Sequence, residues 1–155
     1  MKTLKFTIGI QGSGKSTYTK DKSPVVSTDE LRKEFYGDVD NVTDEKFIFD
    51  TAIQRITDLF EKHNIVYFDA TMVETKHRIT FLGKIKELVE DVELIGVVFS
   101  VDPEVAKARI MADLNSGIDR ADSAHYVDEY YEYFQETMAL IKEGNVLFKC
   151  CEQKV

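Results

Sequence analysis

The sequence lacks most of the features that would cross-link, anchor or export a protein. Of its 155 residues only two are cysteines, and these are adjacent (Cys150 and Cys151), which is a poor placement for joining distant segments. No apolar run approaches the roughly 20 residues that span a bilayer. The N-terminal residues also lack the long apolar centre and small-residue cleavage site of a signal peptide. We therefore expect a cytoplasmic protein with no disulfide framework and no membrane partner.

Metal-ligand clusters and basic charge are also scarce. The three histidines (His63, His77 and His125) are scattered without the spacing of a metal site. Asp and Glu number 28 against 20 Lys and Arg, which gives a formal net charge of −8. Proteins with large nucleic-acid footprints usually carry basic patches, so the charge argues against such a surface. It still permits a single strand terminus to be held by a few arginines.

One segment near the N-terminus matches the phosphate-loop pattern without a mismatch. The run from Gly9 to Thr17 reads GIQGSGKST, with two glycines flanking four residues and followed by Lys-Ser. In this pattern the glycines let the backbone approach a ligand, and successive N–H groups form a concave site for oxyanions. The segment predicts that ATP binds to Gly9, Gln11, Gly12, Ser13, Gly14, Lys15, Ser16 and Thr17.

Three side chains of the predicted nucleotide site have specific chemistry. Lys15 is expected to reach the β- and γ-phosphates, and the Ser16 hydroxyl to ligate Mg²⁺ that the nucleotide brings. Asp69 ends an apolar strand, where it could help to hold Mg²⁺ or orient a neighbouring polar side chain. A plain helix N-cap is the alternative for Asp69.

Apolar runs alternate with amphipathic stretches along the chain. Strands are expected at 4–8, 25–27, 65–68, 94–99 and 146–148, and helices at 17–20, 28–36, 43–60, 71–89, 105–114 and 123–142. Such alternation predicts an α/β fold of the P-loop NTPase type, with three layers. A central parallel sheet of about five strands would carry helices on both faces. Residues 1–155 would form a single domain, with a small lid at about 115–122.

Several local details follow from the same patterns. Ser27–Glu30 and Thr71–Glu74 have the spacing of capping boxes, and Asp102-Pro103 reads as an N-cap followed by proline. The run Ile65–Phe68 is typical of a strand buried on both faces. The apolar helix faces are predicted to comprise Phe47, Ile48, Ala52, Ile56, Leu59 and Phe60, and then Ile79, Leu82, Ile85, Leu88 and Val89. Tyr126, Tyr130, Tyr131, Tyr133 and Phe134 are expected to pack in the core rather than to stack on bases.

Polar residues at three strand ends should meet, because ligands bind beyond the carboxyl ends of parallel strands. Asp29 and Arg32 share a helix face, where Asp29 could act as general base for an acceptor hydroxyl and Arg32 could hold an acceptor phosphate. A helix cap and a surface ion pair are the alternative. Arg120 lies in the predicted lid and could close over the γ-phosphate. Arg109 is either a solvated helix residue or a phosphate contact.

At these residues the sequence resembles the polynucleotide 5′-kinase group of small P-loop kinases, an AAA-type ATP-binding kinase family. The loop resembles that group's Gly-x-Pro-Gly-Ser-Gly-Lys-Ser-Thr, with Gln11 in place of proline. Residues 27–32 resemble the segment that carries its general-base Asp and acceptor-binding Arg. Asp69-Ala70-Thr71, with Arg78 downstream, is similar to its Asp-x-Thr/Asn element, which implies that Thr71 contacts the substrate. Residues 99–109 resemble its fourth strand and next helix, and Arg120 falls at its lid arginine.

Three functions remain open from the sequence. In the first, an enzyme transfers the γ-phosphate of ATP, with Mg²⁺, to the 5′-hydroxyl of DNA or RNA; Lys15, Asp29 and Arg120 would be catalytic. The second keeps this reaction with a nucleoside, sugar or other small metabolite as acceptor, which the acidic charge favours. The third is a nucleotide-dependent switch without turnover. The complete loop, the acid and the lid arginine favour an enzyme.

Overall fold

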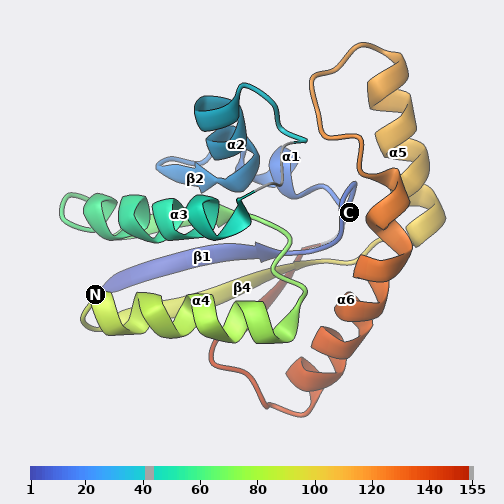
Figure 1. The fold of residues 1–155 in the computed structure, drawn as a ribbon. Coiled ribbons are helices and arrows are strands. Elements are labelled where there is room, and N and C mark those ends of the chain that lie inside the picture. Colours follow the sequence, from blue (N-terminus) through green and yellow to red (C-terminus); the bar gives the residue numbers. More distant parts are fainter. Residues whose placement is uncertain (41–43, 154–155) are drawn as a thin grey trace.

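The computed structural model describes residues 1–40 and 44–153 and contains a five-stranded sheet (Figure 1). All strand pairs are parallel, in the order β2-β3-β1-β4-β5. The strands are β1 (Lys2–Ile8), β2 (Val25–Ser27), β3 (Ile65–Asp69), β4 (Val92–Phe99) and β5 (Lys149–Gln153). Parallel strands require crossover connections, and helices make them here.

Six α-helices connect and cover these strands. They are α1 (Lys15–Thr19), α2 (Thr28–Tyr36), α3 (Glu45–Leu59), α4 (Thr75–Leu88), α5 (Pro103–Asn115) and α6 (Val127–Lys142), within the described residues. A short 3₁₀ turn over Ala124–Tyr126 precedes α6, so the regular helix begins four residues later than expected from Ser123. The α/β fold with a parallel five-stranded sheet is confirmed. Residues 41–43, where the third helix was expected to begin, lie outside the described residues.

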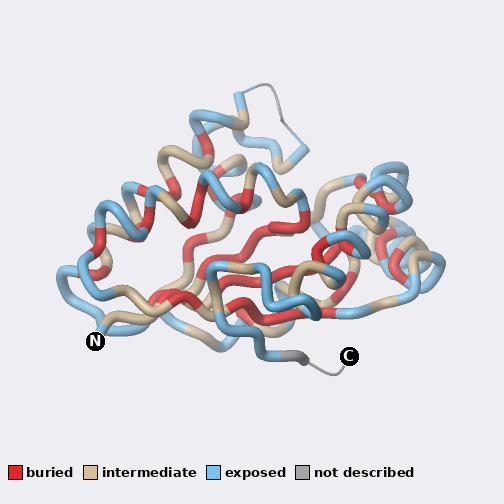
Figure 2. Tube along the Cα trace, turned by 90° about the horizontal axis from the view of Figure 1, so that it is seen from below, coloured by how far each residue is buried: buried red, intermediate tan, exposed pale blue. Residues whose placement is uncertain are grey.

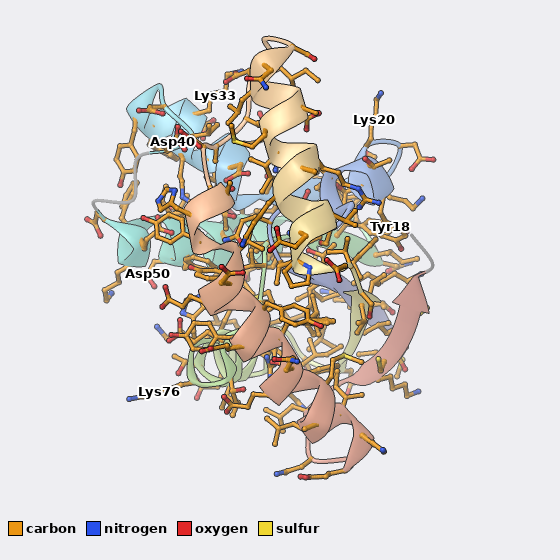
Figure 3. The ribbon with its side chains drawn as sticks, turned by 90° about the vertical axis from the view of Figure 1, so that its right-hand side faces the viewer. Tyr18, Lys20, Lys33, Asp40, Asp50 and Lys76 are labelled. Atoms are coloured by element: carbon orange, nitrogen blue, oxygen red, sulfur yellow. The ribbon has the colours of Figure 1, made fainter. Side chains whose placement is uncertain are left out.

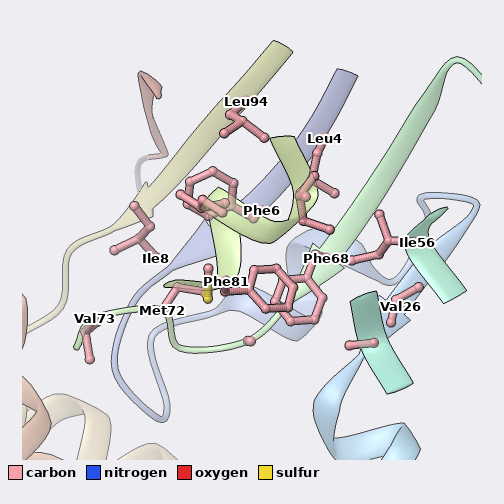
Figure 4. Close-up of a cluster of buried hydrophobic side chains, with 14 of the residues drawn as sticks. Leu4, Phe6, Ile8, Val26, Ile56, Phe68, Met72, Val73, Phe81 and Leu94 are labelled. Carbon is pink, nitrogen blue, oxygen red and sulfur yellow. The ribbon is translucent and has the colours of Figure 1, made fainter. Parts of the chain in front are cut away.

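The main core lies between the sheet and helices α3 and α4. Along β1 the side chains of Leu4, Phe6 and Ile8 are completely buried. Figure 2 shows that buried residues gather in the middle of the molecule, while the outer turns of the helices are exposed. Phe68 of β3 stacks on Phe81 of α4, with ring centroids 4.6 Å apart and planes inclined by 12° (Figure 4). Aromatic pairs of this size contribute substantially through buried area alone.

The opposite face of the sheet is covered less completely. Lys5, Tyr67 and Ile95 remain half-buried, and Ile65 is 42% exposed. Tyr18 of the short α1 packs against Tyr67 there, at a centroid distance of 6.4 Å. The expectation that residues 65–68 are buried on both faces is therefore wrong for Ile65 and Tyr67, because α1 is a helix of only five residues.

Two predicted helix starts are confirmed and one is wrong. Ser27 accepts a hydrogen bond from the Glu30 N–H, and Asp102 caps α5 ahead of Pro103. The Thr71–Glu74 capping box is absent, since α4 begins at Thr75 and shows no side-chain cap.

A buried arginine explains the irregular backbone before α4. Arg78 is 2% exposed and donates to the Met72 carbonyl at 3.0 Å and to the Thr137 hydroxyl at 2.8 Å. Thr137 in turn donates to the carbonyl of Val73 at 2.7 Å. Met72 has φ 52°, a left-handed conformation that few non-glycine residues adopt. Arg78 thus satisfies a carbonyl of this segment and ties it to α6.

Some predicted core residues face solvent instead. Ile79 and Leu88 are 51% and 57% exposed, whereas Arg78 and Phe81 of the same helix are buried. Phe47 is 40% exposed and meets Phe35 edge to face at 5.1 Å, so it joins α3 to α2 rather than to the sheet. Of the predicted aromatic stripe, Phe134 is buried and Tyr130, Tyr131 and Tyr133 pack partly against the core, while Tyr126 is 40% exposed.

The last strand also differs from the expectation. It lies at Lys149–Gln153 and not at residues 146–148. Phe148 contacts Phe6 edge to face at a centroid distance of 5.1 Å, and a Cβ on Gly96 would come within 2.7 Å of its ring. Phe148 therefore packs above Gly96, whereas Leu147 beside it is 51% exposed, and the more polar residues that follow form the strand.

We predict that Arg78→Ala lowers the free energy of unfolding by about 3 kcal/mol, because it removes buried hydrogen bonds and leaves the Met72 carbonyl unsatisfied. Urea denaturation followed by circular dichroism measures the loss. The exposed Lys76→Ala on the same helix (Figure 3) is the control and should cost less than about 0.5 kcal/mol. A loss for Arg78→Ala as small as that of the control would contradict the structural role.

Candidate active site

A cleft of about 1270 Å³ opens at the carboxyl end of the sheet. Its lining includes residues 11–18 of the phosphate loop, 27–30 at the start of α2 and 69–74 after β3. The predicted meeting of these three strand ends is therefore confirmed. Residues 118–123, between α5 and α6, line the same cleft.

The phosphate loop is held by close backbone packing that only glycine permits. Gly12 has φ 76°, and a Cβ there would lie 2.6 Å from the Ala106 carbonyl oxygen of α5. A Cβ on Gly9 would lie 2.5 Å from the Ser13 hydroxyl. Gly9 does not line the cleft; it packs against Ser13 and Phe99 behind the loop. The other predicted loop residues line it.

The Lys15 ammonium lies within the loop, where it donates to the Ile10 carbonyl at 2.7 Å. Burial lowers the pKa of Lys15 to about 8, while the charges of Asp69 and Asp29 oppose this change. Both carboxylates are therefore close enough to influence the lysine electrostatically. A triphosphate in the cleft would supply the charge that this partly desolvated ammonium lacks.

Asp69 joins the end of β3 to α1. Its Oδ2 accepts from the Ser16 hydroxyl at 3.1 Å and from the Thr19 hydroxyl at 2.9 Å. Hard cations prefer oxygen ligands, so the hydroxyl of Ser16 and the carboxylate of Asp69 are suitable groups for Mg²⁺ beside a phosphate. No group of three His, Cys, Asp or Glu side chains that could hold a metal occurs in residues 1–40 and 44–153.

Asp29 and Arg32 lie together at the start of α2, as their spacing predicts. Arg32 Nη1 donates to Asp29 Oδ1 at 2.7 Å. The Asp29 side chain is 54% exposed to the cleft, yet the surrounding protein partly desolvates it and raises the pKa of its carboxyl. The charges of Arg32 and Lys15 oppose that rise. A carboxylate that binds protons more readily is a better general base near neutral pH.

Arg32 also has a partner that the sequence did not indicate. Its Nε donates to Glu45 Oε2 at 3.0 Å, and Nη2 donates to Glu45 Oε1. Glu45 is the first residue of α3, thirteen positions away, so no helix-spacing rule connects it with Arg32. Each of the three guanidinium nitrogens of Arg32 thus has a carboxylate partner.

Two more arginines approach the phosphate loop. Arg109 is exposed, but it lines the cleft and its Nη1 donates to the Gly12 carbonyl at 3.2 Å, while a phosphate contact stays a prediction. Arg120 donates to Asp113 at 2.7 Å, and its Nε is buried with no hydrogen-bond partner in the described chain. Gln11 Oε1 and Ser13 Oγ of the loop are unpaired in the same sense. Such unsatisfied atoms indicate where a polar ligand would bind.

The segment between α5 and α6 is tied to the other side of the cleft. Lys33 of α2 donates to Asp119 at 2.7 Å, and the Asp122 N–H donates to Asp40 Oδ1 at 2.8 Å (Figure 3). These exposed contacts contribute little to stability individually. That residues 115–122 act as a lid stays a prediction.

Thr71 lines the cleft, and its carbonyl accepts from the Gly9 N–H at 3.0 Å. Thr19, Glu45, Phe49, Glu74, His77 and Tyr130 were not singled out as site residues. The position of Thr19 on the helix that follows the loop could have indicated that it lies near the site. For the others the tertiary arrangement of α3, α4 and α6 was needed.

A family model described as AAA domain matches residues 4–136. No curated protein matches the sequence. Among solved structures, a chain of the Pnkp1/Rnl/Hen1 RNA repair complex has a TM-score of 0.73 at 20% identity, covering 89% of this chain and 45% of that chain. This chain therefore spans less than half the length of that relative.

Other similar folds come from different systems. A gluconokinase from Sinorhizobium meliloti 1021 has a TM-score of 0.53 at 14% identity, covering 97% of this chain and 82% of that chain. A chain of the PezAT chromosomal toxin-antitoxin system of Streptococcus pneumoniae has a TM-score of 0.66 at 14% identity, covering 99% and 69%. At these identities the similarity establishes the fold alone. No helix of the described residues is long and apolar enough to cross a membrane.

The pKa of Lys15 leads to a prediction about ATP affinity. Bound phosphate stabilises the protonated amine and raises its pKa, so binding takes up a proton once the pH exceeds the pKa of the ATP-free protein, about 8. We expect the affinity to be constant below that pH and to fall by roughly tenfold per unit above it. Titration calorimetry, corrected for ionisation of ATP itself, measures this slope.

Lys15→Met is the matched control, since it cannot titrate. Its ATP affinity should be low and should not change across the same pH range. An equal slope in both proteins would show that another group is responsible.

Proposed function

The chain belongs to the AAA domain family and has a P-loop kinase-like fold, and we propose that it transfers the γ-phosphate of ATP to a hydroxyl group. One observation carries this proposal. The phosphate loop with Lys15 and the carboxylate of Asp29 line one cleft and influence each other electrostatically. A switch without turnover would require the loop but no carboxylate in this position.

We propose a separate role for each group. Lys15 and the loop N–H groups bind the β- and γ-phosphates, while Ser16 and Asp69 hold Mg²⁺, which neutralises phosphate charge when bound. Asp29 accepts the proton of the acceptor hydroxyl as its oxygen bonds to the γ-phosphorus. The bond from that phosphorus to the bridging oxygen breaks, and ADP leaves. Arg109 and Arg120 stabilise negative charge on the phosphates during transfer.

Two acceptors have separate support. The 5′-hydroxyl of DNA or RNA is supported by the resemblance of residues 27–32 to polynucleotide kinases and by the fold similarity to a chain of an RNA repair complex. A small hydroxyl compound is supported by Glu45 and Asp29, which already pair with the arginine expected to hold an acceptor phosphate. The test offers γ-labelled ATP to 5′-hydroxyl oligonucleotides and, separately, to nucleosides, sugars and sugar acids.

We predict that Asp29→Asn leaves ATP binding unchanged and lowers kcat by about 100-fold or more, because only the proton-accepting group is lost. Asp58→Asn, an exposed change on the outer side of α3, is the control and should retain wild-type turnover. Turnover is measured with the best acceptor from the panel. Full activity of Asp29→Asn would reduce Asp29 to a structural partner of Arg32.

We also predict that Arg120→Ala lowers kcat by about 100-fold while the Kd for ATP changes by less than about threefold, since the contact matters most as charge develops. Arg55→Ala removes an arginine paired with Glu34 on the far side of α2 and serves as the control. Hydrogen exchange with and without a non-hydrolysable ATP analogue tests closure of residues 115–122. Equal exchange in the two states would show that this segment is not a lid.

A further inference from the structure

The part of the cleft beyond Asp29 is both acidic and aromatic. Helices α2, α3, α4 and α6 and the residue before α4 contribute Arg32, Glu45, Phe49, Glu74, His77 and Tyr130 to its lining. We refer to these six residues as the acceptor wall. Under the proposed function, the reacting hydroxyl would lie beside Asp29 and the remainder of the acceptor against this wall.

The one arginine of the acceptor wall is already neutralised. Its side chain is only 12% exposed and is held by Glu45 through two nitrogens and by Asp29 through the third. Paired arginine–carboxylate contacts of this bidentate kind are among the stronger ones in proteins. A phosphate on the acceptor would have to compete for the same guanidinium with Glu45, whose side chain is 38% exposed.

The remaining charge of the wall is negative. Glu74 lines the cleft, and its charge, with that of Glu45, reaches both His77 and Tyr130. Burial lowers the pKa of His77, so the imidazole adds no positive charge at neutral pH. The acceptor wall therefore has two carboxylates, of Glu45 and Glu74, and one arginine, Arg32. An anionic group placed there would be repelled by the excess negative charge.

The rings of the acceptor wall provide a surface for a flat ligand. Phe49 and His77 meet edge to face with centroids 4.3 Å apart, and Tyr130 lines the same region. His77 Nε2 is buried and has no hydrogen-bond partner within the described residues. A ring that brings a hydrogen-bonding group would satisfy this nitrogen and cover the aromatic carbons.

We infer that the acceptor is an uncharged or cationic hydroxyl compound with a ring of nucleoside size, and that Glu45 excludes acceptors carrying phosphate or carboxylate near the reacting hydroxyl. The inference rests on the proposed function, because it assigns a substrate class to the same cleft. It makes Glu45 a specificity-determining residue that acts through Arg32.

The experiment compares neutral acceptors with related acceptors that carry a phosphate or a carboxylate. The pairs are adenosine with adenosine 3′-phosphate and glucose with gluconate, and a 5′-hydroxyl oligonucleotide is included as a fifth acceptor. Transfer from γ-labelled ATP yields kcat/KM for each, for the wild type, Glu45→Gln and Glu34→Gln. Glu34 forms the matched control because it also pairs with an arginine, Arg55, but away from the cleft.

We expect the wild type to prefer the neutral nucleoside over its 3′-phosphate. Glu45→Gln should raise the ratio of kcat/KM for adenosine 3′-phosphate to kcat/KM for adenosine by at least about tenfold, through the KM of the phosphorylated compound. Glutamine keeps the shape of the residue and one acceptor for Arg32, so the fold is preserved. Glu34→Gln should behave as the wild type, and ATP affinity should be equal in all three proteins.

Other outcomes overturn the inference. A wild-type preference for adenosine 3′-phosphate or the oligonucleotide, reduced by Glu45→Gln, would show that Arg32 holds an acceptor phosphate and that Glu45 only orients it. If Glu45→Gln leaves the ratio of kcat/KM for adenosine 3′-phosphate to that for adenosine unchanged, Glu45 does not determine specificity. Transfer to the sugars but to no nucleoside would refute the inference that the acceptor has a ring of nucleoside size. Normal ATP binding with no transfer to any acceptor would instead refute the proposed function.

Discussion

The carboxylate of Asp69 holds together the two parts of the molecule on which the nucleotide site depends. It ends β3, is 7% exposed, and accepts hydrogen bonds from Ser16 and Thr19 of α1. Because β3 lies next to β1 in the sheet, these contacts fix the helix after the phosphate loop against the neighbouring strand. A charged group this deeply buried is tolerated only when its oxygens are satisfied. The loop and the strand end therefore keep one relative position.

The cleft contains two regions of different charge. Near the phosphate loop Lys15, Arg109 and Arg120 gather around the space for the nucleotide. Beyond Asp29, carboxylates of α3 and of the residue before α4 neutralise or outnumber the single arginine. An overall charge of −8 is thus compatible with binding a polyanionic nucleotide, since the basic side chains are concentrated where its phosphates would lie.

The fold and much of the site could be predicted from the sequence because their signals are local. The phosphate loop, the Ser27 and Asp102 caps and the apolar strands each occupy a few consecutive residues. The errors arose where distant segments decide. No local pattern indicates that Arg78 is buried, because the Met72 carbonyl and a hydroxyl on α6 make its burial favourable. Likewise, Phe148 was predicted to lie in the last strand, because the sequence does not show that its ring packs against Gly96. The pairing of Arg32 with Glu45 depends on how α2 and α3 pack, which no sequence spacing encodes.

The central position of β1 has a consequence for how the chain folds during synthesis. Among the strands of the sheet β1 is synthesised first, but its neighbours begin only at Ile65 and Val92. Until both have been translated, β1, which carries the buried Leu4, Phe6 and Ile8, lacks a neighbouring strand on at least one side. Pairing between such distant segments is slow, and unpaired apolar strands are prone to association. The nascent chain is therefore most vulnerable before β4 has been translated, and it becomes protected once β4 docks beside β1.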